Sequence, residues 1–358
     1  MKWYKNNLTK ALNIKYPIIQ APMASAASIE LATSVTNAGG LGSLGLSYYK
    51  LENILPDYQK VLSKTNGSFN LNFMTHKEPR SNESKNKKFK ESIKKYFEEY
   101  NINKIPNFSS TCDSFNENHL ELLLQMSPKV VSFHFGLPKR SFLKKIKEQN
   151  IFIISSATTV EEAIILEKSG VDAIIAQGYE AGGHRGTFAS SYKQGEIGLF
   201  SLLPQVVEAT SLPVIAAGGI ANGNGIAAAI MLGAEGVQIG TAFLSCPEAS
   251  VNSLWKNALD NASIRGTRIT RSLTGRPARG IINRLIKDME NKNNIVPDFP
   301  TVGSVIKPLA NYAASKGDDS FLSLWAGQSA PMNRNISSKK LVELLVKETT
   351  NVLKMYKN

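Results

Sequence analysis

The chain is organised around residues 172–188, which read DAIIAQGYEAGGHRGTF. The apolar run over residues 173–176 is typical of a strand that is buried on both faces of a sheet. It leads into a loop with glycines at positions 178, 182, 183 and 186, and glycine lets a backbone come close to a ligand. His184 lies among them, and imidazole is the side chain whose charge changes most readily near neutral pH. The pattern predicts a catalytic loop, although a tight turn with an incidental histidine would read the same way.

Apolar runs of this kind recur along the chain and alternate with helical patterns. Strands are expected at residues 16–23, 41–46, 69–74, 130–135, 151–155, 173–177, 213–217 and 236–240. This alternation predicts a parallel sheet, and eight units in about 240 residues match an α/β fold of the (β/α)8 TIM barrel type. A doubly wound sheet is the rival fold. Glycines at the ends of the last three strands favour the barrel, because barrel enzymes carry their active-site loops there.

The later part of the chain departs from this alternation. Residues 338–353 form an amphipathic helix that is expected to close the barrel. We therefore expect residues 1–241 and 333–358 to form a cofactor-binding barrel. Residues 242–332 are expected to be a helical insertion after the eighth strand, packed on the barrel as a lid. Residues 77–129 are the least regular part, and a second lid over the site is one interpretation of them.

Composition narrows the class of protein. With 42% hydrophobic and 20% charged residues, the 358-residue chain is typical of a soluble globular protein. No apolar run reaches the roughly 18 residues that span a bilayer, and residues 1–13 lack a secretory signal, so a cytoplasmic protein without a membrane partner is expected. Cys112 and Cys246 lie too far apart for a metal motif, so neither a metal site nor a disulfide is expected.

The net charge of +13 raises the question of a polyanionic partner. Many of the lysines lie between residues 85 and 95, mixed with glutamates, as on the solvated face of a helix. No nucleic-acid-binding module accompanies them, so nucleic acid is not an expected partner. A positive field does favour a small anionic substrate.

Two further segments predict a phosphate site. Residues 216–220 read AAGGI, and residues 238–241 read QIGT. In TIM barrels the loops after strands seven and eight commonly form a phosphate cup, in which backbone N–H groups need glycine for close approach. Thr241 can add a hydroxyl donor. Tight turns without a ligand are the alternative, but the paired loops favour phosphate.

Taken together, these segments resemble the FMN-dependent nitronate monooxygenases, formerly called 2-nitropropane dioxygenases, and most closely the first class of that family. The resemblance rests on QAPM at 20–23, NFMTH at 72–76, AQGYEAGGHRG at 176–186, and TGRPARG at 274–280. It covers about residues 17–332 and is weak over residues 77–129. The loop with His184 is its most specific part.

The resemblance implies a flavoprotein oxidoreductase with FMN as its cofactor and a role in detoxification. It implies His184 as the catalytic residue and these cofactor-binding residues: Ala21, Pro22 and Met23 along the flavin ring, Asn72 and Gln177 at the ring or ribityl chain, Gly182 passing close to the cofactor, and Gly219, Gln238, Ile239, Gly240 and Thr241 at the phosphate.

The implied reaction oxidises a small anionic nitronate, such as propionate 3-nitronate, with O2 to a carbonyl compound and nitrite or nitrate. His184 would act as a base on a neutral nitroalkane, or would orient and stabilise a preformed nitronate. The active protein would be a monomer or a homodimer. The alternative enzyme is an FMN-dependent enoyl-acyl carrier protein reductase that uses NAD(P)H and resembles this chain in the barrel, the flavin site and the Gly-Gly-His loop. A flavin-binding protein without catalysis is a further alternative.

The remaining candidates are less specific. His76 follows the third strand and is equally suited to a site role or a packing role. His134 is expected to be half-buried and satisfied by a neighbour, and His119 is expected at the surface. Arg276 and Arg279 can hold an anion, but we favour a role in bracing the turn at residues 275–277. The three tryptophans, Trp3, Trp255 and Trp325, are expected to provide packing.

Overall fold

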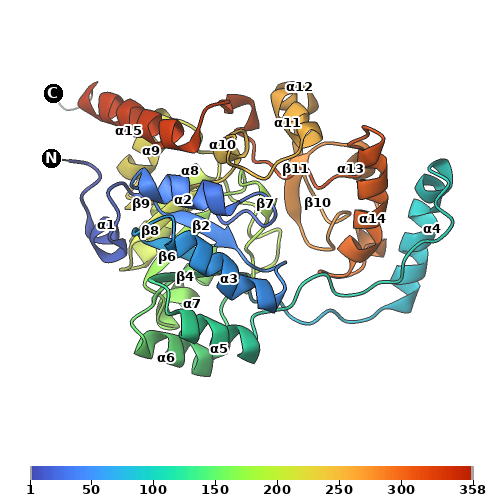
Figure 1. Cartoon of the computed structure of the whole chain (residues 1–358), viewed down its shortest axis with the longest axis horizontal. Coiled ribbons are helices and arrows are strands. Elements are labelled where there is room, and N and C mark those ends of the chain that lie inside the picture. The colour runs from blue at the N-terminus through green and yellow to red at the C-terminus, as the bar shows by residue number, and fades with distance from the viewer. Residues whose placement is uncertain (1, 356–358) are drawn as a thin grey trace.

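The computed structural model describes residues 2–355 and confirms the TIM barrel (Figure 1). Eight parallel strands form one sheet in the order β1-β9-β8-β6-β5-β4-β3-β2. An isolated bridge between Ile19 and Leu41 brings β1 beside β2 and so closes the ring. All eight expected strands are present, and the doubly wound alternative is wrong. The strands are β1 (Ile18–Gln20), β2 (Gly42–Gly45), β3 (Phe69–Met74), β4 (Val130–His134), β5 (Phe152–Ala157), β6 (Ala173–Gln177), β8 (Val214–Ala217) and β9 (Gly236–Ile239).

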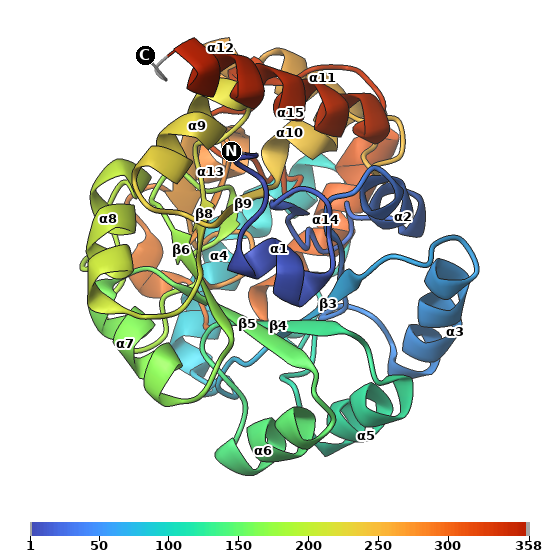
Figure 2. The ribbon, with the colours of Figure 1, turned by 90° about the vertical axis from the view of Figure 1, so that its left-hand side faces the viewer.

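Helices surround the barrel, as Figure 2 shows in a view along it. Two of these helices, α2 and α7, begin at side-chain caps: the hydroxyls of Ser28 and Thr159 accept hydrogen bonds from the amides of Leu31 and Glu162. The closing helix α15 (Ser338–Met355) packs against α9 and α2. The ring consists of α2 (Ile29–Asn37), α3 (Leu51–Leu62), α5 (Glu117–Met126), α6 (Arg140–Glu148), α7 (Val160–Lys168), α8 (Leu199–Ala209) and α9 (Gly223–Met231).

A short helix that the sequence did not predict, α1 (Asn7–Leu12), lies across the amino-terminal end of the barrel (Figure 2). It begins with a capping box between Asn6 and Thr9. The side chains of Leu8 and Leu12 are fully buried in one cluster with barrel residues such as Ile175. Because α1 fills this end, the carboxyl ends of the strands are left as the open face of the barrel.

The insertion joins the predicted catalytic loop through a small sheet. Strands β10 (Thr267–Thr270) and β11 (Ala278–Ile281) are antiparallel, and β11 also pairs with β7 (Gly183–His184), so that Ala278 lies opposite His184. The sequence placed residues 183 and 184 in a loop, and the structure shows that they form a strand edge. The other elements of the insertion are α10 (Thr241–Leu244), α11 (Ser253–Asp260), α12 (Ala262–Arg265), α13 (Arg284–Asp288), η1 (Asn293–Ile295), α14 (Val302–Ser315) and η2 (Ala330–Met332).

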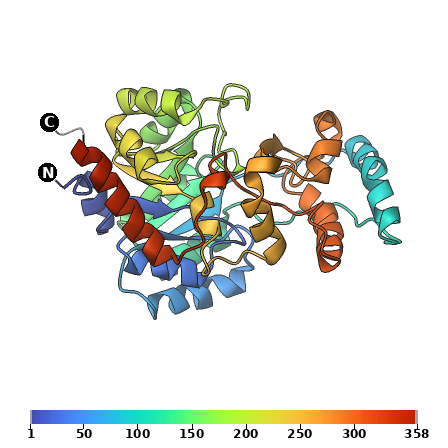
Figure 3. The same ribbon diagram turned by 90° about the horizontal axis from the view of Figure 1, so that it is seen from above.

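The lysine-rich helix α4 (Glu83–Glu99) lies beyond the insertion, on the side away from the barrel (Figures 1 and 3). Its apolar face shares a second hydrophobic core with the insertion, including Phe89, Tyr96 and Leu309. Its lysines face solvent, as expected. Helix α4 therefore extends the insertion and does not cover the barrel mouth. Among residues 2–355, none of the helices has the length and apolar character that a membrane crossing requires.

Candidate active site

A cavity of about 820 Å³ opens at the carboxyl ends of the strands, which is within the usual size of small-molecule sites. Ile239 does not line this cavity. The Ile239 side chain is buried in the barrel core, and the Ile239 carbonyl accepts a hydrogen bond of 2.8 Å from the Ala21 amide. His184 and the ten other predicted cofactor residues line the cavity, namely Ala21, Pro22, Met23, Asn72, Gln177, Gly182, Gly219, Gln238, Gly240 and Thr241.

The loops after β8 and β9 form a polar corner of this cavity. Gly218 and Gly219 have φ angles of +106° and +73°, a region that favours glycine. A Cβ atom on Gly218 would lie 3.0 Å from the Ala181 amide nitrogen, so the backbone here tolerates no side chain. The Thr241 hydroxyl oxygen accepts a hydrogen bond of 2.9 Å from the Gly327 amide, which leaves its proton for a ligand. This corner has the donors and the open backbone that a phosphate group requires.

Asn72 presents a single oriented acceptor to the cavity. Its amide nitrogen donates to the hydroxyl and the carbonyl of Ser132, at 2.9 and 3.2 Å. Its Oδ1 atom has no protein partner among residues 2–355 and is not sealed from the cavity. The amide is therefore fixed in one orientation, with the oxygen available to a donor on a ligand.

The His184 side chain lies in an aromatic pocket of the cavity wall. Its ring centroid is 5.7, 5.2 and 5.6 Å from those of Phe135, Phe299 and Trp325. Burial, followed by the positive charge of Arg276, holds the pKa of His184 well below its ordinary value. The imidazole is therefore neutral near pH 7, with one protonated nitrogen and one lone pair. A neutral imidazole in such a wall can accept a proton from a ligand.

The backbone of His184 is held by side chains of two barrel strands, β6 and β4. Its carbonyl accepts hydrogen bonds from Gln177 Nε2 at 3.0 Å and from His134 Nε2 at 3.1 Å. Gln177 Oε1 accepts a further bond of 2.8 Å from the Gly186 amide. The side chain of Gln177 is thus largely committed to this loop, and only one of its N–H groups remains for a ligand.

His134 is half-buried and satisfied by its neighbours, as the sequence predicted. Because a carbonyl cannot donate, His134 Nε2 must carry the proton in its bond to His184. Its Nδ1 atom lies 2.6 Å from the Ser156 hydroxyl, which donates to it in the neutral form. Burial lowers the pKa of His134 to about 4, in keeping with a neutral ring.

Three arginines hold the loop through its carbonyl groups. The buried Arg185 donates to the carbonyls of Gly178, Gln177 and Gly195, at 2.6, 3.1 and 2.8 Å. Arg276 donates to the carbonyls of Arg185 and Thr187. Arg279 donates twice to the Tyr179 carbonyl, at 3.1 and 2.9 Å. Arg276 and Arg279 therefore have a structural role, but not at the predicted place: they brace residues 179–187, whereas Arg271 braces the turn at residues 275–277 by donating to the Gly275 carbonyl.

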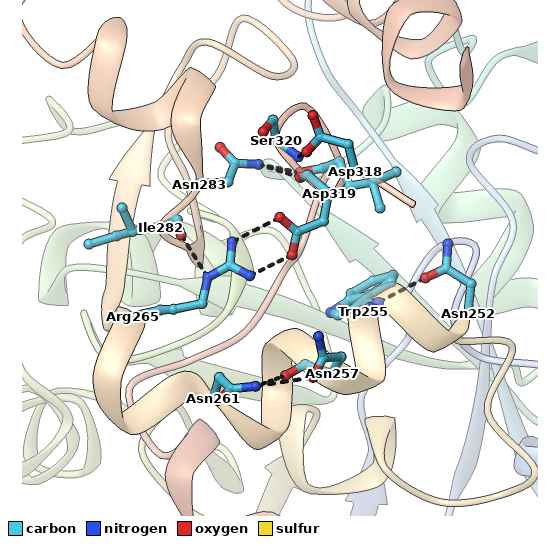
Figure 4. Close-up of polar contacts among 11 residues, drawn as sticks. Asn252, Trp255, Asn257, Asn261, Arg265, Ile282, Asn283, Asp318, Asp319 and Ser320 are labelled. Atoms are coloured by element: carbon cyan, nitrogen blue, oxygen red, sulfur yellow. Dashed lines mark hydrogen bonds and ion pairs between the residues drawn. The ribbon is translucent and has the colours of Figure 1, made fainter. Parts of the chain in front are cut away.

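Sequence reasoning missed the cavity residues that the insertion contributes. Figure 4 shows how this part is fixed: Arg265 forms an ion pair with Asp319 and donates to the Ile282 carbonyl. Trp255 lies beside this cluster, and both it and Trp325 line the cavity, so these two tryptophans do more than pack. Apart from Thr274, which begins the segment TGRPARG, no motif distinguishes these residues, because only the folded insertion brings them to the barrel. Other lining residues from the insertion include Leu273, Thr274, Ser304, Lys307 and Asn311.

His119 and His76 are both buried against aromatic rings. His119 is only 5% exposed, with its ring against Phe73 and Phe115, so the surface prediction is wrong. The residue lies in a polar-looking stretch but on the buried face of α5, beside Leu120. His76 is 7% exposed and packs on Phe299 with ring centroids 5.0 Å apart, outside the cavity lining. Burial lowers its pKa to about 4.

The thiols and the acidic groups add no further chemistry in the part of the chain that the structure describes. Cys112 and Cys246 are both free and buried, and burial raises the pKa of each thiol to about 12. Within residues 2–355, no cluster of three His, Cys, Asp or Glu side chains is arranged to hold a metal ion.

Comparisons with known proteins agree with this geometry. The family model described as nitronate monooxygenase matches residues 5–348. A probable nitronate monooxygenase of Staphylococcus aureus (strain MSSA476) is 37% identical over 352 residues, which cover 98% of this chain and 99% of that protein. One from Staphylococcus saprophyticus is 37% identical over 348 residues, covering 97% and 98%.

Solved structures share the fold of nearly the whole chain. A nitroalkane oxidase from Streptomyces ansochromogenes superposes with a TM-score of 0.88 at 34% identity, and the match covers 98% of this chain and 99% of that one. FabK from Thermotoga maritima follows with a TM-score of 0.76 at 28% identity, covering 98% of both chains.

Proposed function

Since the chain belongs to the nitronate monooxygenase family, we propose that it is an FMN-dependent enzyme that oxidises alkyl nitronates, such as propionate 3-nitronate, with O2. The products would be a carbonyl compound and nitrite or nitrate. The observation that supports this most directly is a neutral His184 in the wall of a cavity that also holds a glycine-lined, donor-rich corner. The histidine suits proton chemistry, and the corner suits the phosphate of a flavin nucleotide.

The residues present fit FMN. Its phosphate would lie against the backbone at Gly219 and Gly240 and the hydroxyl of Thr241, where a Cβ atom or a carboxylate would interfere. Asn72 Oδ1 would accept a hydrogen bond from the flavin ring, and the segment Ala21 to Met23 would lie along the ring. Bound flavin would accept electrons from the substrate and pass them to O2.

His184 has a different task for each form of substrate. With a neutral nitroalkane, the unprotonated imidazole nitrogen would take the α-proton and generate the nitronate within the cavity. With a preformed nitronate no proton needs to be removed, and the ring would orient the anion. Lys307 at the cavity wall and the net charge of +13 both favour entry of an anion.

The insertion belongs to the same proposal. It supplies one wall of the cavity, so residues 242–332 would act as a lid segment on a barrel formed by residues 1–241 and 333–358. Helix α4 would be attached to this segment through their common core. A cytoplasmic location and a monomeric or homodimeric state complete the proposal.

The test is the absorbance spectrum of the purified protein before and after anaerobic addition of propionate 3-nitronate. We expect a yellow protein whose flavin is bleached by the nitronate and reoxidised by air with release of a carbonyl product. Bleaching by NADH but not by nitronate would instead favour the enoyl-acyl carrier protein reductase. A yellow protein that reacts with neither would favour flavin binding without catalysis, and a colourless protein that retains no added FMN would refute all three.

A further inference from the structure

The Thr274 hydroxyl is the only protein group within residues 2–355 that hydrogen-bonds the His184 ring. His184 Nε2 lies 2.9 Å from Thr274 Oγ1. The same hydroxyl lies 3.3 Å from the Arg276 carbonyl, to which it donates. A threonine hydroxyl has one hydrogen, and a carbonyl can only accept. With that hydrogen directed to Arg276, the oxygen of Thr274 is placed to accept from His184, and Nε2 would then carry the imidazole proton.

The other ring nitrogen is consequently the one with the lone pair. His184 Nδ1 has no hydrogen-bond partner among residues 2–355, and it is not sealed off as His76 Nδ1 is. A neutral histidine exists as one of two tautomers, and the hydrogen bond that one ring nitrogen makes decides which one is present. We propose that Thr274 is a positioning residue that holds His184 in the Nε2–H tautomer and so makes Nδ1 the nitrogen that accepts the substrate proton. This inference rests on the base role in the proposed function.

Arg276, whose carbonyl accepts the hydrogen bond from Thr274, is itself held in place. The Arg276 side chain donates to the carbonyls of Arg185 and Thr187, which directly follow β7 in the loop that carries His184. Two residues further on, Ala278 pairs with His184 in the small sheet. The insertion therefore reaches His184 twice, once through its backbone ladder and once through the hydroxyl that selects the tautomer.

Ring position and tautomer have separate causes, which makes the proposal testable. The ring is held by Phe135, Phe299 and Trp325, and the backbone by Gln177 and His134. Removing the hydroxyl of Thr274 leaves all of these contacts. The Thr274→Val variant, which keeps the shape of the side chain, should therefore keep the ring in place and lose only the preference for one tautomer.

The experiment compares wild type with Thr274→Val, Thr274→Ser and the control Thr270→Val. Thr270 is a buried threonine of the same sheet whose hydroxyl bonds to Ser272, away from the cavity lining. The first readout is the nitrogen NMR signal of the His184 ring in protein labelled at its four histidines, assigned with His184→Asn. The second is kcat/KM for a neutral nitroalkane and for its preformed nitronate.

We expect a protonated Nε2 and an unprotonated Nδ1 in wild type, Thr274→Ser and Thr270→Val, and a mixture of tautomers in Thr274→Val. We also expect Thr274→Val to lower kcat/KM for the nitroalkane about tenfold, which corresponds to about 1.4 kcal/mol, the size of one hydrogen bond. The nitronate value should change less than about twofold, because its reaction needs no base.

An unchanged His184 signal in Thr274→Val, or a protonated Nδ1 in wild type, would overturn the proposal. Equal losses with nitroalkane and nitronate, or a failure of serine to restore the wild-type signal, would reduce Thr274 to a packing residue. The NMR result needs no turnover, so it stands even if the wild-type protein oxidises no nitronate, which is the outcome that would refute the proposed function instead.

Discussion

Glu162 offers a sharp test of how the loop beyond His184 is held, and glutamine is the substitution that isolates its charge. The side chain is fully buried at the start of α7. Its Oε1 atom accepts hydrogen bonds from the amides of Phe188, Ala189 and Ser190, at 2.6, 3.0 and 3.2 Å. Its Oε2 atom accepts from the amide and the hydroxyl of Thr158, both at 2.8 Å. One carboxylate thus joins residues 188–190 to the end of β5.

The size of the effect follows from counting donors. A glutamine amide nitrogen cannot accept, so Glu162→Gln loses either the bond from the Thr158 amide or the three bonds from residues 188–190, while the Thr158 hydroxyl can turn and accept from the new amide. Each buried donor that is left without a partner costs about 1–3 kcal/mol. With at least one such donor, we expect the free energy of unfolding to fall by about 1–3 kcal/mol, a substantial part of the 5–15 kcal/mol typical of a folded protein.

Urea unfolding followed by tryptophan fluorescence measures this change, with the slope of the transition as a check that the unfolded state is unaltered. The matched control is Glu161→Gln, since Glu161 is the exposed neighbour in the same turn and its loss should change stability by less than about 0.5 kcal/mol. A loss below about 1 kcal/mol in Glu162→Gln would refute the reasoning, because it would mean that the loop amides find other partners.

Three further predictions concern His184, the backbone at Gly182 and the two buried histidines His76 and His134. Replacing His184 by asparagine should lower turnover of a neutral nitroalkane by about a hundredfold or more with FMN still bound, and unchanged turnover in a steady-state assay would sink the base role. Gly182→Ala would place a Cβ atom 2.5 Å from the Gly327 amide nitrogen, so we expect a loss of about 1–3 kcal/mol in stability and less flavin per protein by absorbance; a wild-type melting curve would argue against this. Lowering the pH from about 7.5 to 5 should reduce the free energy of unfolding by roughly 2 kcal/mol for each of His76 and His134, since their pKa of about 4 lies below the 6.5 of an unfolded histidine and the unfolded chain alone takes up the protons. This stability is complete above pH 6.5 and is lost as the pH falls toward 4, and a flat profile in denaturant titrations across that range would contradict it.

The barrel could be predicted because its signals are local. Most strands are short apolar runs followed by glycine or a polar residue, and several helices begin at a capping side chain such as Ser28 or Thr159. Helix α1 was missed because it has only six residues and is stabilised by tertiary burial of Leu8 and Leu12 against the strands. His119 was misplaced for a related reason, since its buried face is set by packing against Phe73 and Phe115.

Only part of the site could be predicted: the residues on the barrel strands could be placed, and those on the insertion could not. Residues at strand ends, such as Asn72 and Gln238, could be placed in the cavity because parallel strands bring their carboxyl ends together. Thr274 and Trp325 could not, because their position depends on how the insertion folds back on the barrel. The role of Glu162 could not be predicted either, because its three hydrogen bonds to residues 188–190 join it to a later loop and carry no local signal.

The pairing between β7 and β11 limits how the insertion can act as a lid. A movement of the whole insertion away from the barrel would break the backbone ladder at Ala278 and His184, and with it the bond between Thr274 and the imidazole. Such an opening would leave the His184 ring without the partner that is proposed to set its tautomer. Helix α14 has no strand pairing to the barrel, and it carries Lys307 and Asn311, both exposed at the cavity wall. Its apolar face is buried in the second hydrophobic core with Leu285 and Phe321, so α14 is held with the rest of the insertion. Because Lys307 is already exposed, an anion can enter beside it while the sheet keeps His184 and its bond to Thr274 in place.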